Sequence, residues 1–440
     1  MADIVSGLSF GPAGVLATVA VEKIAPTTGF TPPRVDIASL IAPSVGLRGD
    51  KPETPPDLAD RIRAASGSLS TSRAFAEAVL DVETRLAGPG PQVHEQLAEL
   101  FQRIREVAGQ PTDSTTRDAV VTAARDLVEG IRRRAAALDA ATAALDQRVR
   151  ENAQTATAVM QQLADTNTAI GRGEDLTARR DQLATELADL VGGSARVRDG
   201  QMMFVLDDGT VLVDRGHAAK LVAVNNTNTE TTSLEVVTDD THRDVTAAIG
   251  GGSIGAGLAA RDGMVARVAT ELDQLASDLA LAFNGVHSAN AGLDGATGRP
   301  AFGALGAITG AAGEIALDPG LARNSAQLAT SIPGAGPRNN GGALAMLELA
   351  AAPVAAGGRS LIDAAADMAG GVGARAADAR ATIARDTLVA DNLVGLRNSL
   401  ADVDIKGERT NLARFEHASS ATTRFVSSID NLLGDLIDRL

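Results

Sequence analysis

The feature that most constrains this chain is an apolar stripe that runs through residues 411–440. Apolar or small side chains recur there at alternating steps of three and four residues, which is the a/d seam of a heptad pattern. The seam comprises Leu412, Phe415, Ser419, Thr422, Val426, Ile429, Leu433, Leu436 and Leu440, and Phe425, Leu432 and Ile437 widen it. A helix cannot bury such a face alone. The stretch therefore predicts a helix that packs against the N-terminal segment, another subunit, or both.

Composition narrows what such helices can pack into. The 440 residues include no Trp, Tyr or Cys and only 9 Phe, so small aliphatic side chains supply most of the apolar surface. Such side chains at helical spacing favour closely packed helices over a core with aromatic anchors. The lack of Cys in the sequence excludes disulfides, thiol catalysis and Cys-based metal sites. The net charge of −15 argues against nucleic acid or an anionic membrane as partner, because both attract clustered Lys and Arg.

The sequence contains no run of about 18 apolar residues, so we expect no membrane insertion. The N-terminal stretch MADIVSGLSFGPAGVLATVAVEK begins with Asp3 and has no basic segment, so it does not resemble a cleavable signal peptide. A chain of this kind that leaves the cell is expected to use another route.

Helical periodicity returns after every interruption, which predicts a mainly α fold with a β insertion. We expect an elongated antiparallel helical bundle or coiled-coil rod, built from both chain ends, with a small inserted β domain. The expected segments are an N-terminal axial segment and linker (1–56), the first part of the helical rod (57–193), a small β insertion (194–250), a return helix of the rod (251–289), a loop-rich Gly/Ala segment (290–340), the last part of the rod (341–400) and a C-terminal axial helix (401–440).

Several local patterns predict strands and helix ends. QMMFVL-DDG-TVLVD (201–214) predicts a hairpin, because two apolar runs flank a turn sequence. KLVAV (220–224) and SLEVV (233–237) predict a second strand pair, and GEIAL (313–317) predicts one short strand. Glycine pairs at 357–358 and 370–371 and a turn at 401–407 predict interruptions of the last helices.

One glycine motif resembles a nucleotide site. Gly250, Gly252 and Gly255 fit the G-x-G-x-x-G of dinucleotide sites, which requires a turn between a strand and a helix inside a parallel βαβ unit. The preceding stretch is polar, and nothing after the expected helix reads as a second parallel strand. We therefore interpret the motif as the return from the β insertion into the rod.

No other pattern predicts chemistry. Hairpin turn chemistry explains the aspartates at 207, 208 and 214 better than a metal site does. The 5 histidines lack metal-ligand spacing, so we interpret each as a surface or helix-face residue. We predict no catalytic residue, no metal, no cofactor and no enzymatic activity.

The end of the chain resembles a known family. Residues 399–405, 411–415 and 433–437 occupy the places of the turn, the NLxRFQ start and the LDxLI end of the flagellar hook-associated proteins that form the first hook–filament junction, within the flagellar axial protein family. Further stretches resemble motifs of that family in the same order, namely 111–131, 162–192, 251–302 and 338–349. The similarity is closest in 251–302, through Arg261-Asp262, Phe283-Asn284 and His287.

The resemblance implies a structural subunit of the extracellular bacterial flagellum. It implies secretion through the flagellar type III apparatus and assembly as a helical ring through helices from both chain ends. The implied partners are hook protein, the second hook-associated junction protein, an export chaperone and further copies of the chain. The apolar stripe is then the axial assembly and chaperone interface. Two departures affect the axial part, because Pro12 falls inside the expected N-terminal helix and Lys406-Gly407-Glu408 replaces an acidic run.

Three alternatives stay open. A flagellin or the second junction protein of the same axial family is the nearest. A non-assembling cytoplasmic coiled-coil scaffold accounts for the helices but not for the ordered motifs. A degenerate paralogue that no longer assembles fits the altered N-terminal segment.

Leu433→Asp combined with Leu436→Asp is expected to abolish assembly, because the two carboxylates charge the seam without touching residues 57–400. Circular dichroism should show that helicity is retained. A general loss of helicity would mean that the terminal helix belongs to the core of the rod instead.

Overall fold

The computed structural model describes residues 56–88, 90–198, 200–225, 231–238 and 241–437. Between 400 and 437 it describes the backbone and the side chains of Thr410, Ala413, His417 and Ser420. The predictions for the N-terminal axial segment and for Leu440 lie outside the described residues. Every element below lies within Pro52–Leu440.

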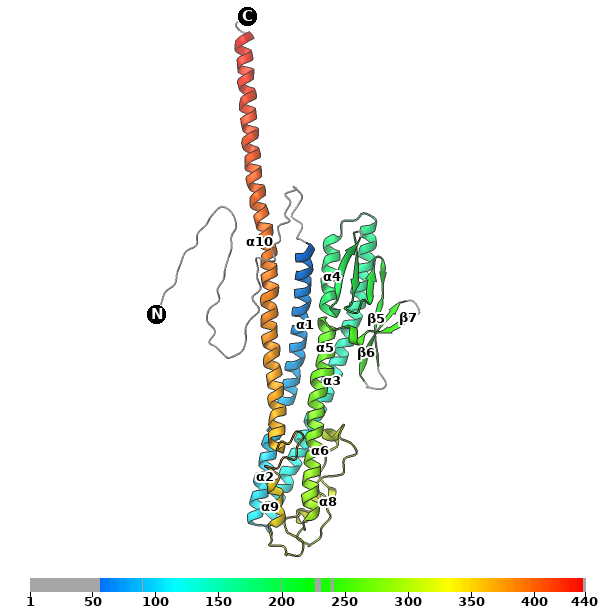
Figure 1. The fold of residues 1–440 in the computed structure, drawn as a ribbon, viewed down its shortest axis with the longest axis vertical. Helices are drawn as coiled ribbons and strands as arrows, with labels where there is room; N and C mark the ends of the chain where they lie inside the picture. Colours follow the sequence, from blue (N-terminus) through cyan, green and yellow to red (C-terminus); the bar gives the residue numbers. More distant parts are fainter. Residues whose placement is uncertain (1–55, 89, 199, 226–230, 239–240, 438–440) are drawn as a thin grey trace, which may run out of the picture. The chain divides into compact units, whose positions relative to one another are not determined.

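The fold is mainly α with a small β insertion, as the periodicity predicted (Figure 1). The longest helices are α1 (Pro56–Ala87), α3 (Ser114–Gly171) and α10 (Leu361–Ile437), and the other main helices are α2 (Val93–Gly109), α4 (Thr177–Val191), α5 (Gly252–Ala259) and α6 (Ala266–Ala289). Residues Ala260–Val265 form a π-helix between α5 and α6. The loop-rich part contains the short helices α7 (Ala311–Glu314), α8 (Pro319–Arg323) and α9 (Gly341–Glu348).

Local sequence explains where the helices begin. Asp113 caps α3 by accepting hydrogen bonds from the backbone N–H groups of Thr115 and Thr116. At the start of α2, the Glu95 carboxylate accepts a hydrogen bond from the Gln92 N–H at 2.6 Å. Each carboxylate satisfies a donor that has no partner within the helix, and a negative charge is favourable at that end.

The β insertion consists of two antiparallel sheets. The first contains β1 (Ser194–Arg198), β2 (Gln201–Val205), β3 (Val211–Asp214) and β4 (His217–Ala218) in that order, and the second contains β5 (Lys220–Asn225), β6 (Thr232–Thr238) and β7 (Thr241–Asp244). The predicted hairpin is β2–β3 and the second predicted pair is β5–β6, so both are confirmed. The sequence does not signal β1, β4 or β7, because these strands are short and mostly polar.

Two predicted interruptions are wrong, because α10 runs unbroken through Gly370-Gly371 and through 401–407. A glycine costs a helix about 1 kcal/mol relative to alanine, which the alanine-rich turns around Gly370-Gly371 outweigh. The predicted strand at 313–317 is present only at its end, where Leu317 forms an isolated antiparallel bridge with Phe302. Ala311–Glu314 form the helical turn α7, because Asp273 of α6 accepts hydrogen bonds from the N–H groups of Gly310 and Ala312 at 2.8 and 2.9 Å.

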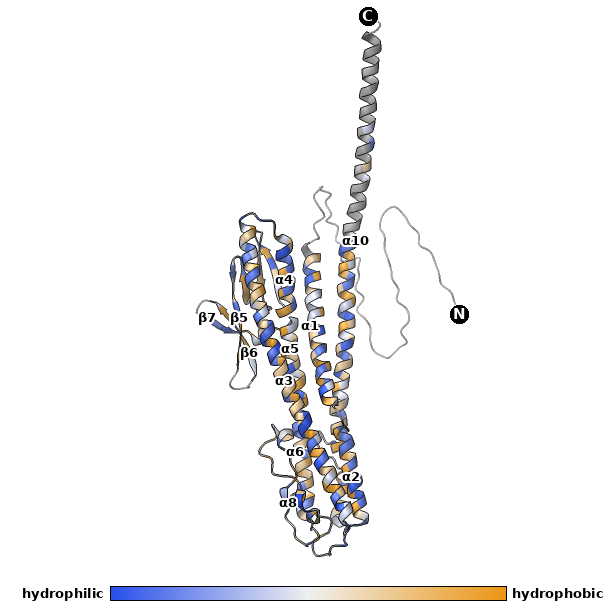
Figure 2. Cartoon of the chain, turned by 180° about the vertical axis from the view of Figure 1, so that it is seen from behind, coloured by the Kyte–Doolittle hydropathy of each residue, from blue (hydrophilic) through white to orange (hydrophobic). Residues whose placement is uncertain are grey.

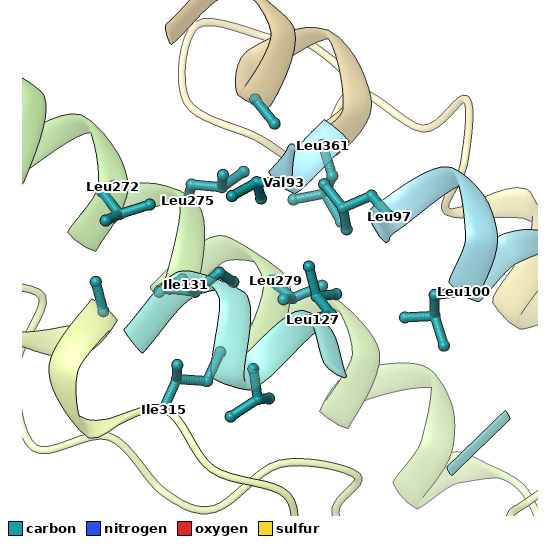
Figure 3. Close-up of a cluster of buried hydrophobic side chains, with 14 of the residues drawn as sticks. Val93, Leu97, Leu100, Leu127, Ile131, Leu272, Leu275, Leu279, Ile315 and Leu361 are labelled. Atoms are coloured by element: carbon teal, nitrogen blue, oxygen red, sulfur yellow. The ribbon is translucent and has the colours of Figure 1, made fainter. Parts of the chain in front are cut away.

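A first hydrophobic cluster joins α2, α3, α6 and the start of α10. Figure 3 shows Leu97 of α2, Leu127 of α3, Leu279 of α6 and Leu361 of α10 within it, together with Ile315 from the segment after α7. Figure 2 shows hydrophobic and hydrophilic residues interspersed along α1, α3 and the earlier part of α10, as expected for helices that bury one face.

A second hydrophobic cluster joins the later part of α3 with α4, α5 and both sheets. Leu163 of α3, Leu187 of α4 and Phe204 of β2 are fully buried in it. On α3, the first cluster extends to Leu145 and the second begins at Val149. The helix is therefore shared between two cores.

The first half of α1 meets α4 through small and hydroxyl side chains. Gly67 lies against Ala188, where an added Cβ would be 3.6 Å from the Ala188 carbonyl oxygen. Ser66 donates a hydrogen bond to the Asp189 carboxylate at 3.3 Å, and Ser70 donates to the Asp189 carbonyl at 3.1 Å. Burial raises the pKa of the Asp189 carboxyl, and the Ser66 hydroxyl partly offsets this effect. The contact thus combines small side chains with hydrogen bonds.

Leu127→Ala is expected to lower the free energy of unfolding by about 2–5 kcal/mol, because the side chain is fully buried between helices. Denaturant unfolding followed by circular dichroism measures the change, since the chain has no Trp or Tyr. Leu388→Ala is the matched control, because Leu388 is 64% exposed. Equal effects of the two substitutions would contradict the assignment of the first cluster as a core.

Candidate functional site

Arg261 of the π-helix lies where the two hydrophobic clusters meet. Its side chain is 4% exposed and binds the Asp146 carboxylate of α3 at 2.5 Å, the Thr232 carbonyl of β6 at 2.7 Å and the Asp262 carboxylate at 2.6 Å. Asp146 also accepts a hydrogen bond from the Thr232 N–H at 3.3 Å. A charge is tolerated inside a protein when it is paired and hydrogen-bonded. The pair therefore fixes β6 against α3 and the π-helix.

Two polar side chains attach the first sheet to the helices. The Asn167 amide of α3 donates hydrogen bonds to the carbonyls of Met202 and Arg215, each at 2.8 Å, and accepts one from the Met202 N–H at 2.9 Å. Asn167 therefore satisfies the backbone groups of Met202 in β2, which lies beyond the last residue pair between β2 and β3. Arg180 of α4 donates to the Gly200 carbonyl at 3.0 Å, in the turn between β1 and β2.

His287 of α6 binds two parts of the segment that follows its helix. Its ring is fully buried, with Nδ1 2.7 Å from the Arg299 carbonyl and Nε2 accepting a hydrogen bond from the Ala329 N–H at 3.0 Å. Because a carbonyl oxygen only accepts, Nδ1 carries the proton and the ring is neutral. The interpretation of every histidine as a surface or helix-face residue is wrong for His287, whose partners are backbone groups that no local pattern reveals.

Arg117 of α3 is a second buried anchor of the same segment. Its guanidinium is 1% exposed and donates hydrogen bonds to the carbonyls of Pro111, Ser325 and Leu328 at 2.6, 3.1 and 2.9 Å and to the Thr330 hydroxyl at 2.5 Å. Within the described residues no carboxylate pairs with it. Burial lowers the pKa of Arg117 to about 10, so the side chain stays charged at neutral pH. Arg117 lies in the stretch 111–131 that resembles a family motif, but no sequence pattern identifies its buried partners.

The G-x-G-x-x-G motif serves close packing of backbone. Gly252 has a φ of 66°, and a Cβ there would lie 2.4 Å from the Leu190 carbonyl carbon. A Cβ on Gly255 would lie 2.7 Å from the Gly250 carbonyl carbon. A 3-10 turn rather than a strand precedes α5, and both sheets are antiparallel. The motif returns the chain from the β insertion to the helices, as the sequence suggested, and lacks the surroundings of a dinucleotide site.

The predicted interface residues other than Leu440 all belong to α10, whose backbone is helical through Ile437. Nothing is described of their side chains, so their contacts stay a prediction. The described side chains nearby are exposed, and each lies two residues before a seam position: Thr410, Ala413, His417 and Ser420. Two residues rotate by about 200° around a helix, so this exposed row lies opposite the predicted seam.

The earlier part of α10 packs against α1 in the antiparallel sense. Ser72 donates a hydrogen bond to the Asp386 carboxylate, and Arg380 pairs with Glu83 at 3.2 Å. In the described ranges, no group of three or more acidic or histidine side chains could hold a metal ion. No helix in those ranges is both long and apolar enough to cross a membrane.

Comparison with known proteins gives consistent matches. Residues 79–302 match the family model described as the flagellar hook-associated protein FlgK helical domain. The chain is 28% identical to flagellar hook-associated protein 1 of Bacillus subtilis over 183 residues, which cover 40% of this chain and 36% of that protein. It is 25% identical to the Salmonella typhimurium protein of the same name over 264 residues, 56% of this chain and 47% of that protein. The alignments thus span about half or less of these relatives.

A solved structure shares the fold. The flagellar hook junction protein FlgK from Burkholderia pseudomallei matches with a TM-score of 0.71 and 12% identity, over 77% of this chain and 100% of that chain. At this identity the likeness concerns the fold alone.

Gly252→Ala is expected to destabilise the protein by more than about 1 kcal/mol, because a left-handed φ and a close backbone contact both oppose a Cβ. Gly285→Ala is the matched control. This glycine lies in α6 with nothing within 4 Å of an added Cβ, so alanine should stabilise the helix by up to about 1 kcal/mol. Thermal unfolding distinguishes the two signs, and a neutral Gly252→Ala would rule out the packing role.

Proposed function

Because this chain belongs to the FlgK family of flagellar hook-associated proteins, we propose that it is a structural subunit of the junction between the flagellar hook and filament. The observation that carries the proposal is the match of residues 79–302 to the helical domain of that family. This range contains α2 to α6 and the complete β insertion. The solved hook junction protein shares the fold over 77% of this chain.

The proposed location is the extracellular flagellum, where copies of the chain form a helical ring between the hook protein and the second hook-associated junction protein. The chain reaches this site through the flagellar type III apparatus, and an export chaperone binds it beforehand. The sequence contains no Cys, so no disulfide can obstruct passage of an unfolded chain.

The C-terminal part of α10 is the proposed assembly and chaperone interface. Support comes from the unbroken helical backbone through Ile437, which brings the seam positions of the predicted interface onto one face. The exposed row at 410, 413, 417 and 420 lies on the other face and carries no large apolar side chain. An amphipathic helix of this kind gains stability when a partner helix covers its apolar face.

We assign a proposed structural role to each of the predicted segments. Residues 1–56 and 401–440 form the axial part, and the rod consists of 57–193, 251–289 and 341–400. The β insertion (194–250) and the loop-rich segment (290–340) are attached to the rod. The buried polar anchors support this arrangement, because each binds one of the two attached segments to a helix.

Purified protein is expected to bind the tips of isolated hooks, and a variant that lacks residues 405–440 is expected not to bind. Electron microscopy of negatively stained hooks measures the bound fraction. The truncation removes the predicted seam in the C-terminal part of α10 and leaves both hydrophobic clusters intact. Circular dichroism of the truncated chain should confirm that its remaining helices are folded.

A matched pair of variants separates the two faces of α10. Leu433→Asp with Leu436→Asp should prevent binding, whereas Ala413→Asp with Ser420→Asp places the same charges on exposed positions and should allow it. Equal binding by the full-length and truncated chains would show that the terminal helix is not the interface. Lack of binding by the full-length chain would favour the non-assembling alternatives.

A further inference from the structure

The segment between α6 and α9 contains little regular structure, and side chains of α3 and α6 hold it in place. Its helices α7 and α8 are 4 and 5 residues long. Asn284 of α6 binds the backbone of Ala301 and Phe302 at 2.8–3.0 Å, and Asp273 binds the start of α7. His287 and Arg117 bind its later part. The conformation of the segment therefore depends on a small set of side-chain anchors.

Residues 325–331, which we call the strap, depend on two of these anchors. Arg117 holds the carbonyls of Ser325 and Leu328, and His287 holds the Ala329 N–H. Further backbone bonds link Ser331 with Ala291 and link the Thr330 carbonyl with the start of α9. Leu328 is the one large apolar side chain of the strap that is buried. Local opening of the strap therefore exposes little apolar surface of the core.

Among these anchors, His287 is the one whose hydrogen bonding changes with protonation, because its Nε2 would turn from an acceptor into a donor. In the neutral ring Nε2 accepts from the Ala329 N–H, while Nδ1 donates to the Arg299 carbonyl. Protonation converts Nε2 into a donor, which then faces another donor at 3.0 Å. The bond to the strap is lost and a buried charge is left unpaired, which is costly in an enclosed site.

The charged groups around the ring come from two elements. Burial is the largest effect and lowers the pKa of His287; Asp318 favours the charged ring, whereas Arg299 and Arg117 disfavour it. Arg117 belongs to α3, and Arg299 and Asp318 belong to the segment itself. A protonated His287 would therefore share its surroundings with the charged, buried Arg117.

We propose that His287 is an acid-sensitive latch whose protonation opens the strap from α3 and α6 while the helices stay folded. The device concerns the isolated chain and does not depend on the proposed function. Opening lets the ring bind one proton, so the population of the open form rises as the pH falls. The rise is at most tenfold per pH unit, and it begins below the ordinary histidine value of 6.5. Above that pH the latch stays closed.

A single tryptophan can report on the strap, because the chain has none. Gln327→Trp places the reporter in the strap, and Gln201→Trp places a matched reporter in β2, since both glutamines are half-buried. Between pH 7.5 and 4.5, emission of the Gln327→Trp protein should shift towards that of the unfolded chain with a one-proton slope. Emission of the Gln201→Trp protein and the far-ultraviolet circular dichroism should stay constant.

Adding His287→Asn to the Gln327→Trp protein tests the assignment to this ring. Asparagine can still donate to the Arg299 carbonyl but does not titrate, so the acid-induced shift should disappear. If that variant does not fold, His287→Gln replaces it. A shift that persists in both variants would overturn the proposal. Coincidence of the shift with loss of helicity, or a joint shift of the two reporters, would also overturn it.

Discussion

Helix α3 contributes buried side chains to both hydrophobic clusters. The rest of the described fold depends on which part of α3 packs into which cluster. Its 58 residues span roughly 87 Å, which exceeds the width of one small core. Between Leu145 and Val149 the apolar stripe gives way to Asp146, and a carboxylate at this depth requires a partner. Arg261 of the π-helix is this partner, and it also binds the backbone of β6. The Arg261–Asp146 ion pair therefore lies at the boundary between the two hydrophobic clusters and binds the β insertion to the helices.

The helices could be predicted because their signal is repeated along many turns. The stripe from Val120 through Ile131 to Leu145 is visible in the sequence and is buried in the structure. The hairpins β2–β3 and β5–β6 could also be predicted, because each combines two apolar runs with a turn between them. Strands β1 and β7 could not be predicted, because an edge strand has one neighbour and its exposed side chains need not be apolar. The glycines at 370–371 and 407 predict breaks that α10 does not have, because the helix-forming residues around them outweigh a single glycine's cost.

The polar anchors show a different limit of sequence reasoning. The resemblance in 251–302 includes Arg261, Asn284 and His287, but a family motif does not identify the groups that they bind. Their partners are backbone groups of segments that come close only in the folded chain, so no spacing rule reaches them. Arg117 lies in the stretch 111–131 that resembles a family motif, which does not identify its partners, and no pattern singles out Asp146. The candidate interface on α10 is the reverse case, since its periodicity is plain in the sequence while its contacts remain a prediction.

The contact between α1 and α4 has a mechanical consequence. It joins two helices through Gly67, Ser66 and Ser70, and such side chains bury little apolar surface. Hydrogen bonds of this kind can break and re-form with neighbouring groups after a small shift, whereas an interlocked apolar core resists shear until its packing fails. Tension along the helix axes is therefore expected to slide the first half of α1 against α4 before it opens either cluster.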